Sequence, residues 1–319
     1  MKRPIVVVTR KLPPVVESRL IADYVPRLNP DDLQLSRESL LESAVGADAL
    51  LITITDRFDT ELIQKLPRSV KIISTFSAGC DHIDMKAARE RGIVVTNVPD
   101  VLTAATAEVA ILLMLGAARR ASEGELVMRS GNWPGWSPTY MLGRQLSGKR
   151  LGIVGFGRIG EATARIAKGL GLEILYHSRR SSSAAEQLGA RYFADLDEML
   201  ENSEVLSLHC PSTPSTIGLL STDRIAKLPR GAIVVNTARG DLIDDAALIN
   251  ALETGSVGAA GLDVYNGEPA IHPGYRLLPN TFLLPHLGSA TIETRQAMGM
   301  RAIDNLDTFF SNNHCNHAA

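Results

Sequence analysis

The stretch Leu151-Gly152-Ile153-Val154-Gly155-Phe156-Gly157-Arg158-Ile159-Gly160 decides the fold of this chain. Its apolar run predicts a buried parallel strand over residues 150–154, and a helical pattern follows over residues 158–169. In such a strand-turn-helix unit the first glycine permits a tight bend, the second lets the backbone approach a pyrophosphate, and the third lets the helix pack on the strand. The phosphate would lie at the helix N-terminus, where free N–H groups favour negative charge. The alternative is a glycine loop that merely turns, and the strand before it and the helix after it argue against that.

Composition limits the class of protein. The chain has 319 residues, which favours two domains, and its net charge of −2 offers no basic excess for binding nucleic acid. The cysteines are odd in number and far apart, which predicts a reducing compartment rather than a disulfide framework; they are Cys80, Cys210 and Cys315. The apolar run from Val109 to Ala118 is shorter than the roughly twenty residues of a membrane span. We therefore expect a cytoplasmic protein.

The first part of the chain reads as an α/β domain without a nucleotide fingerprint. Strands are expected over residues 5–8, 49–54, 71–75 and 93–95, and helices include residues 36–45 and 84–91. No glycine motif follows the first strand, so the dinucleotide belongs to the second domain. The expected boundaries are residues 1–99 with 288–319 for a substrate domain, and residues 100–287 for a dinucleotide-binding domain.

The second part alternates strands and helices again. A long apolar helix is expected over residues 103–120, in which Glu108 is interpreted as a partner of the helix dipole. A loop then carries Trp133 and Trp136, and an interface role for it is favoured over burial in the domain's own core. Further strands are expected over residues 172–176, 204–208, 232–236, 258–264 and 281–284, with Asp195 and Asp244 as helix caps.

The last helical pattern, residues 290–310, is expected to cross back and pack on the first domain, and the tail from Asn312 is expected to fray. The fold class is thus α/β, with two doubly wound parallel-sheet domains separated by a cleft: a Rossmann cofactor domain and a flavodoxin-like substrate domain.

The nucleotide is indicated by the end of the strand after the glycine turn. In a Rossmann unit the residue there meets the adenosine ribose, and an acid selects NAD. Here residues 172–176 lead into His177-Ser178-Arg179-Arg180, so no acid is present and two guanidinium groups can bind a 2′-phosphate. NADPH (NADP) is the expected cofactor, with NADH possible but inferior. The alternative is that both arginines are ordinary surface charges.

Three other strand ends carry residues that together suit carbonyl reduction. They are Arg239, Glu268 and His286, and in open α/β sheets such ends converge on the ligand. Histidine is a suitable general acid, a neighbouring carboxylate favours its charged form, and arginine can bind a substrate carboxylate. His82 and His272 are rival acids. No cluster has the spacing of metal ligands, so no metal is expected.

The chain resembles the D-isomer-specific 2-hydroxyacid dehydrogenases, and within them the glyoxylate/hydroxypyruvate reductases. The family resemblance rests on Gly155–Gly160, Asn236-Thr237-Ala238-Arg239-Gly240, Gly267-Glu268-Pro269 and Pro285-His286-Leu287-Gly288-Ser289. The closer resemblance rests on Phe76–Asp84, Asp100–Thr103 and the loop Trp133-Pro134-Gly135-Trp136.

The resemblance implies specific roles. Arg239 would bind and polarise a 2-oxo acid, Glu268 would hold the imidazole, and His286 would donate the proton. The N–H groups of Ala78 and Gly79 would take the substrate carboxylate, with Trp136 also at the substrate. The implied cofactor-binding residues are Thr106, Gly155, Phe156, Gly157, Arg158, Ile159, Gly160, Ser178, Arg179, Arg180, Cys210, Pro211, Thr216, Thr237, Ala238, Arg239, Asp263, His286, Gly288 and Ser289.

The resemblance also implies a homodimer in which the tryptophan loop crosses towards the partner's active site. The expected reaction is reduction of glyoxylate or hydroxypyruvate to glycolate or D-glycerate. One alternative is another 2-oxo acid, such as pyruvate, phenylpyruvate or a branched one, because the loops at residues 54–58 and 76–79 and the tryptophan loop set substrate size. Another is a dinucleotide-sensing corepressor-like module, which the complete set of Arg239, Glu268 and His286 disfavours.

Overall fold

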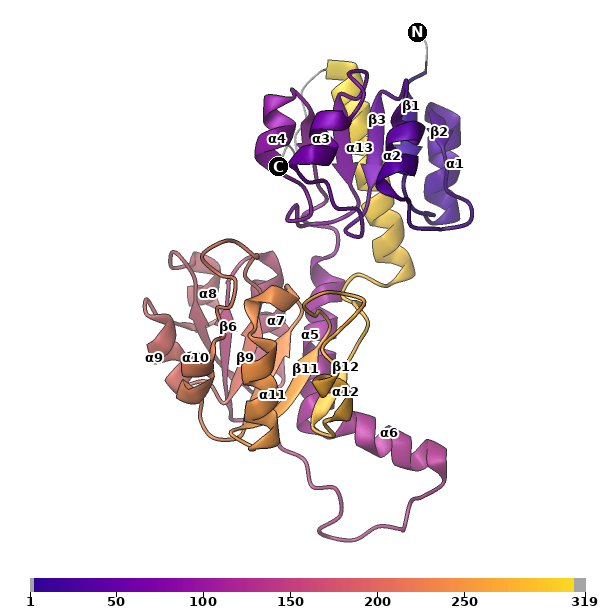
Figure 1. Cartoon of the computed structure of the whole chain (residues 1–319). Coiled ribbons are helices and arrows are strands. Elements are labelled where there is room, and N and C mark those ends of the chain that lie inside the picture. The colour runs from indigo at the N-terminus through magenta and orange to yellow at the C-terminus, as the bar shows by residue number, and fades with distance from the viewer. Residues whose placement is uncertain (1–2, 313–319) are drawn as a thin grey trace. The chain divides into compact units, whose positions relative to one another are not determined.

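A computed structural model describes residues 3–312 of the chain. The fold divides into two compact units (Figure 1). Unit 1 comprises the described residues up to Leu102 together with those from Ala290 onwards, and unit 2 comprises Thr103–Ser289. Among the described residues, no helix is long and apolar enough to cross a membrane. Cys315 and the tail beyond Asn312, for which fraying was expected, lie outside the described residues.

Unit 1 is built on a five-stranded, all-parallel sheet with the order β2-β1-β3-β4-β5. Its strands are β1 (Ile5–Val8), β2 (Val25–Arg27), β3 (Ala49–Ile52), β4 (Ile72–Thr75) and β5 (Val94–Thr96). Its helices are α1 (Pro14–Asp23), α2 (Arg37–Ala44), α3 (Thr60–Lys65), α4 (Met85–Glu90) and α13 (Ile292–Asn312). This is the flavodoxin-like strand order, in which the chain direction across the sheet reverses between β1 and β3.

The prediction that the last helix returns to the first domain is confirmed. α13 packs beside β4 and α1, and Ser74 Oγ on β4 donates a 3.0 Å hydrogen bond to the carbonyl of Ala302 on α13 (Figure 1). The other face of the sheet packs its apolar side chains against α2, α3 and α4. Both faces are therefore covered, as an all-parallel sheet requires.

Unit 2 is built on a seven-stranded, all-parallel sheet with the order β12-β11-β10-β9-β6-β7-β8. Its strands are β6 (Arg150–Val154), β7 (Glu173–His177), β8 (Arg191–Tyr192), β9 (Val205–Leu208), β10 (Ala232–Asn236), β11 (Val257–Leu262) and β12 (Thr281–Leu283). The predicted fold class, two doubly wound parallel sheets, is confirmed. The order reverses between β6 and β9, so ligands of such a sheet bind where β6 and β9 end.

Two apolar layers cover the sheet of unit 2. One contains α5 (Thr103–Ala118), α7 (Arg158–Gly169) and α8 (Ser183–Gln187), and the other contains α9 (Leu196–Glu201), α10 (Thr222–Lys227), α11 (Asp245–Glu253) and the short α12 (Gly274–Leu277). Asp195 and Asp244 cap α9 and α11 as predicted, accepting hydrogen bonds from the backbone N–H groups of Asp197 and Ala247.

The long helix expected over residues 103–120 is confirmed as α5, which ends two residues earlier than predicted. α5 ends at Ala118, Arg120 adopts a left-handed conformation with φ of 54°, and a separate helix α6 (Ala121–Ser130) begins after it. The carbonyl of Ala118 accepts a 2.7 Å hydrogen bond from the N–H of Arg144 instead of continuing the helix. A contact far along the chain therefore ends α5.

Candidate active site

The glycine turn between β6 and α7 has the shape that a dinucleotide requires. Gly155 has φ of 92°, and a Cβ there would lie 2.6 Å from the backbone nitrogen of Cys210, beyond the end of β9. A Cβ on Gly160 would lie 2.2 Å from the carbonyl oxygen of Gly155, so only glycine lets α7 come this close. A Cβ on Gly157 would meet nothing within 4 Å. This open space at the N-terminus of α7 fits the pyrophosphate of a dinucleotide.

The end of β7 presents two cationic side chains beside this turn. β7 pairs with β6, and Ser178 Oγ closes the tip by donating a 2.5 Å hydrogen bond to the carbonyl of Arg180. Arg179 and Arg180 are exposed, and neither forms an ion pair with any residue of the described range 3–312. Both guanidinium groups are therefore available for an anion.

The segment after β9 faces the same turn. Thr216 Oγ1 donates a 2.7 Å hydrogen bond to the carbonyl of Pro211, which folds this segment back on itself. Burial raises the pKa of the Cys210 thiol to about 11, so this side chain stays neutral. Gly155 and Cys210 thus meet where the two central strands end.

The turn that carries Arg239 is held by the buried Asn236 at the end of β10. Asn236 Oδ1 accepts a 2.9 Å hydrogen bond from the N–H of Ala238, and its Nδ2 donates a 2.8 Å hydrogen bond to the carbonyl of Arg239. A Cβ on Gly240 would lie only 1.9 Å from the carbonyl carbon of Tyr265. The Arg239 turn therefore lies directly against the segment that leads to Glu268.

Glu268 and His286 form a hydrogen-bonded pair. His286 Nδ1 lies 2.8 Å from Glu268 Oε2, and Glu268 Oε1 accepts a 2.7 Å hydrogen bond from the N–H of Tyr265. Burial alone would raise the pKa of Glu268. The pKa nevertheless lies below its ordinary value, because His286 contributes a hydrogen bond and a positive charge, Tyr265 donates its N–H, and Arg239 adds a second positive charge. Glu268 is therefore ionised at neutral pH. The structure thus brings together all three residues that the sequence suggested.

The backbone at His286 is strained and held by Asp263. His286 has φ of 56°, which is uncommon for a residue other than glycine. Its N–H donates to the carbonyl of Asp263 at 2.9 Å, and the Asp263 carboxylate accepts from the N–H groups of Leu287 at 2.6 Å and Gly288 at 2.8 Å. Three hydrogen bonds to one residue thus fix the loop that carries the imidazole. Strain of this kind persists only where the surroundings over-determine it.

Asp263 and Thr106 meet at the same loop. Thr106 Oγ1, at the start of α5, donates a 3.0 Å hydrogen bond to the carbonyl of Gly288. Asp263 is almost completely buried, and this burial raises its pKa despite the two N–H groups that stabilise the carboxylate. The predicted residues Thr106, Asp263 and Gly288 are therefore neighbours in space.

In unit 1 the segment after β4 presents backbone N–H groups. Asn97 Nδ2 donates a 2.7 Å hydrogen bond to the carbonyl of Ala78, and Ser77 Oγ donates one of 2.6 Å to the carbonyl of Gly79. Because the C=O and N–H of a trans peptide point in opposite directions, the bond from Asn97 turns the Gly79 N–H to the other side. Two side chains thus fix the backbone at Ala78 and Gly79.

The remaining candidates lie elsewhere. Trp136 is 82% exposed on the irregular segment after α6, and among the described residues no hydrogen bond or ring contact joins it to Glu268 or His286. His272 Nδ1 accepts from the N–H of Gly274, and His82 Nε2 bonds Thr75 Oγ1. Within residues 3–312 no cluster of His, Cys, Asp and Glu could hold a metal ion.

Sequence reasoning did not single out several residues that support the site. The side chains of Asn97 and Ser77 and the N–H of Tyr265 hold these loops by hydrogen bonds. Asn97 follows β5 directly and Ser77 lies two residues beyond the end of β4, and a polar residue just after a strand is the signal that could have found them. No feature of the neighbouring sequence distinguishes Tyr265, whose N–H donates to Glu268 within a turn.

A doubly wound sheet with this glycine turn, and a histidine paired to a carboxylate, define a dehydrogenase that uses a nicotinamide dinucleotide. Residues 111–288 match the family described as "D-isomer specific 2-hydroxyacid dehydrogenase, NAD binding domain". The chain belongs to this family of NAD(P)-dependent enzymes, which confirms the resemblance found in the sequence.

Individual relatives cover nearly the whole chain. A glycerate dehydrogenase of Hyphomicrobium methylovorum is 45% identical over 97% of both chains. A glyoxylate reductase of Pyrococcus furiosus is 41% identical over 96% of this chain and 92% of its own. The crystal structure of an NADPH-dependent glyoxylate/hydroxypyruvate reductase of Sinorhizobium meliloti, in complex with NADP and malonate, matches with a TM-score of 0.90 at 32% identity, covering 100% of this chain and 97% of its own.

Proposed function

We propose that the protein reduces glyoxylate and hydroxypyruvate to glycolate and D-glycerate, with His286 as the proton donor. The observation that carries the proposal is the 2.8 Å pair of His286 and Glu268 beside the turn of Arg239. Relatives of 41–45% identity named glyoxylate reductase and glycerate dehydrogenase support the substrate class, because hydroxypyruvate is the 2-oxo acid of glycerate.

The chain supplies the proton and the charges of the reaction. A bound nicotinamide dinucleotide supplies hydride to the carbonyl carbon of the 2-oxo acid. Glu268 holds Nδ1 of His286, which leaves Nε2 to give a proton to the carbonyl oxygen, so that C=O becomes CH–OH. Arg239 polarises that oxygen and stabilises the negative charge that develops on it.

Unit 1 binds the substrate and unit 2 binds the cofactor in this proposal. The N–H groups of Ala78 and Gly79 take the substrate carboxylate, supported by the bond that Asn97 makes. Thr106, Asp263 and the segment His286–Ser289 lie at the nicotinamide end, and the glycine turn lies at the pyrophosphate.

The preferred cofactor is NADPH, with NADH used less well. Two exposed guanidinium groups, those of Arg179 and Arg180, lie at the end of β7, where an acid would repel the 2′-phosphate. The relative from Sinorhizobium meliloti is described as NADPH-dependent and shares 32% of its sequence with this chain.

The protein acts as a homodimer in this proposal. Large apolar side chains are exposed on α5, on α6 and in the segment after it; they are Leu112, Leu115, Leu126, Met128, Trp133 and Trp136. A second copy of the chain would cover this surface, with the loop Trp133–Trp136 reaching towards the partner's substrate. Light scattering on a Leu126→Glu variant tests this: the variant should be monomeric where the wild type is dimeric.

A direct assay tests the proposed reaction. The protein is mixed with NADPH and glyoxylate, and NADPH consumption is followed by its near-ultraviolet absorbance. Rapid consumption that saturates with glyoxylate is expected. The same assay with hydroxypyruvate, pyruvate, phenylpyruvate and a branched 2-oxo acid identifies the substrate class, and no consumption with any of them would refute the proposal.

A further inference from the structure

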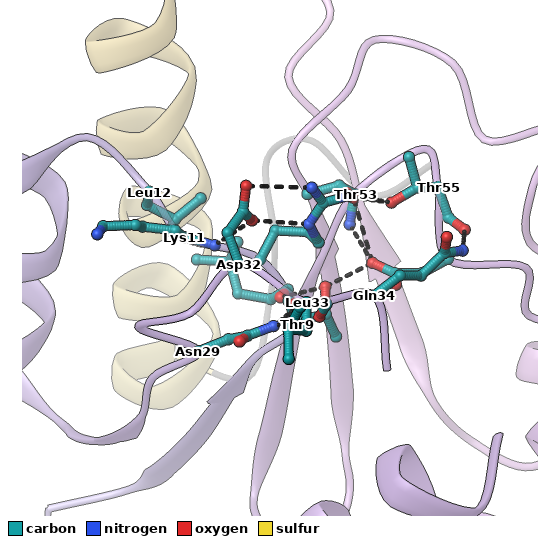
Figure 2. Close-up of polar contacts among 12 residues, drawn as sticks. Thr9, Lys11, Leu12, Asn29, Asp32, Leu33, Gln34, Thr53 and Thr55 are labelled. Carbon is teal, nitrogen blue, oxygen red and sulfur yellow. Dashed lines mark hydrogen bonds and ion pairs between the residues drawn. The ribbon is translucent and has the colours of Figure 1, made fainter. Parts of the chain in front are cut away.

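A polar cluster occupies the carboxyl ends of β1 and β3 in unit 1 (Figure 2). These two strands lie where the strand order reverses, which is where sheets of this kind bind ligands. Figure 2 shows Asp32, Thr53, Thr55 and Gln34 converging there, with dashed lines for their hydrogen bonds and ion pairs. None of these residues has a role in the reaction proposed above.

Arg10, directly after Thr9 at the end of β1, lies at the centre of the cluster. Its Nε and Nη2 donate to the two carboxylate oxygens of Asp32 at 2.8 and 3.1 Å, and its Nη1 donates to Thr55 Oγ1 at 3.2 Å. Asp32 also accepts from the N–H of Lys11 at 3.0 Å. A two-pronged pair of this kind fixes the direction of the guanidinium group as well as its position.

The segment after β3 is held from several sides. Gln34 Nε2 donates a 3.0 Å hydrogen bond to the carbonyl of Thr55, whose side chain is the one held by Arg10. The buried Asp56 accepts from the N–H of Thr53 at 2.8 Å and from Thr9 Oγ1 at 2.5 Å. Both the side chain and the carbonyl of Thr55 are thus anchored by residues that precede β3 in the chain.

This segment runs beside the one that would receive the substrate carboxylate. The N–H of Phe76 donates to the carbonyl of Ile52 at 2.7 Å, so the two segments leave adjacent strands together. They meet again where the N–H of Phe58 donates to the carbonyl of His82 at 2.8 Å. Residues 53–57 therefore form a wall beside Ala78 and Gly79, and Ile54, 38% exposed, is the large apolar side chain on that wall.

We propose that Arg10, held by Asp32, is a positioning residue that fixes Thr55 and thereby the position of Ile54. The position of Ile54 in turn sets the size of the 2-oxo acid that the enzyme accepts. The inference rests on the proposed function. Glyoxylate has no side chain, so its productive binding requires that Ile54 stays close to the substrate site. A wall freed from Arg10 leaves room for a branched side chain and holds glyoxylate less well.

The test compares two arginine variants in the full-length enzyme. Arg10→Met should lower kcat/KM for glyoxylate relative to that for a branched 2-oxo acid by about tenfold, the scale on which pockets discriminate one or two methylene groups. The loss should lie in KM for glyoxylate, and KM for NADPH should not change. Arg19→Met is the matched control, because Arg19 is similarly exposed (29% against 26%) and pairs with Asp304 and Asp307 of α13.

A second variant separates positioning from stability. Thr55→Val removes the hydroxyl that Arg10 holds and leaves the pair of Arg10 with Asp32 intact. It should shift the same ratio, and the double variant should add little to either single change, because residues in one network are not additive.

The outcomes are distinguishable. If the wild type reduces glyoxylate and both Arg10→Met and Thr55→Val keep its ratio to within about twofold, the inference is overturned while the proposed function stands. An Arg19→Met variant that shifts the ratio as much as Arg10→Met overturns it too. A wild type that reduces no 2-oxo acid overturns both.

Discussion

His286 Nδ1 and Glu268 Oε2 lie 2.8 Å apart although the two residues are 18 positions apart in the chain. The carboxylate accepts a hydrogen bond, so it fixes the imidazole proton on Nδ1 and leaves Nε2 as the reactive nitrogen. Each partner is also anchored separately, Glu268 by the N–H of Tyr265 and the His286 loop by Asp263. Contacts on both sides therefore hold the pair in place.

Replacing Glu268 by Gln should change the pH dependence of reduction. Folding lowers the pKa of Glu268 below its ordinary value of 4.5. The ionised carboxylate therefore stabilises the folded protein fully above pH 4.5, and this stabilisation is lost as pH falls through the lower pKa of the folded state. Without the carboxylate the imidazole of His286 loses the charged partner that holds it, so kcat/KM for glyoxylate should fall by roughly tenfold or more at neutral pH, and the fall in activity that protonation of Glu268 causes in acid should be absent. A pH profile of kcat/KM measures this, with the exposed Glu253→Gln as control. An unchanged profile would show that Glu268 does not govern the donor.

His209 should make the folded state sensitive to acid. Its Nε2 bonds Ser207 Oγ at 2.8 Å, its Nδ1 is enclosed without a partner among the described residues, and burial lowers its pKa from 6.5 to about 4. The unfolded chain therefore takes up the proton first, and stability should be lost by up to about 1.4 kcal/mol per pH unit as pH falls from about 6.5 towards 4. Urea unfolding at about pH 7 and about pH 5 measures this loss, which His209→Gln should reduce. Equal losses in both proteins would exclude His209 as the cause.

The three glycine positions along α7 should respond differently to alanine. Gly160→Ala places a Cβ 2.2 Å from the Gly155 carbonyl and should destabilise the fold by several kcal/mol, whereas Gly157→Ala meets open space and should weaken NADPH binding while leaving stability nearly unchanged. Gly169→Ala, at the end of the same helix with nothing within 4 Å, is the control for both measurements. Thermal unfolding and NADPH titration separate the cases. A Gly157→Ala variant with normal NADPH affinity would show that the pyrophosphate does not bind at the N-terminus of α7.

Changing Arg179 and Arg180 together to Ala should raise KM for NADPH more than KM for NADH. Each guanidinium bond to a phosphate is worth about 1.5–3 kcal/mol, so the ratio of the two constants should change by at least about tenfold. Arg165→Ala, on the exposed side of α7 and paired with Glu161, is the control. If the double variant affects both nucleotides equally, the two arginines do not read the 2′-phosphate.

Elements with a complete local signal could be predicted to the residue. β6, the glycine turn and α7 match the prediction in their bounds, because an apolar run, three glycines and a helical pattern follow one another without interruption. β10 is equally clear, being fully buried. The residues proposed as catalytic follow such strands, and this is why the sequence could suggest Arg239 and His286.

Elements that depend on distant parts of the chain could not be predicted from the sequence. β2 contains Pro26 and β8 has only two residues, and both are edge strands whose pairing is supplied by a single neighbour. The end of α5 depends on Gly143, where a Cβ would lie 2.6 Å from the carbonyl of Ala118. The clamp of Arg10 on Asp32 and Thr55 joins three separate loops and has no local pattern at all.

The most direct measurement is the turnover of His286→Gln beside that of His272→Gln. His286 pairs with Glu268, whereas His272 Nδ1 accepts from the N–H of Gly274 in its own turn. With saturating NADPH and glyoxylate, His286→Gln should lose about 10²- to 10⁴-fold in kcat, the usual contribution of a general acid, while still binding NADPH, and His272→Gln should keep the wild-type rate. A His286→Gln enzyme with wild-type turnover would contradict the account.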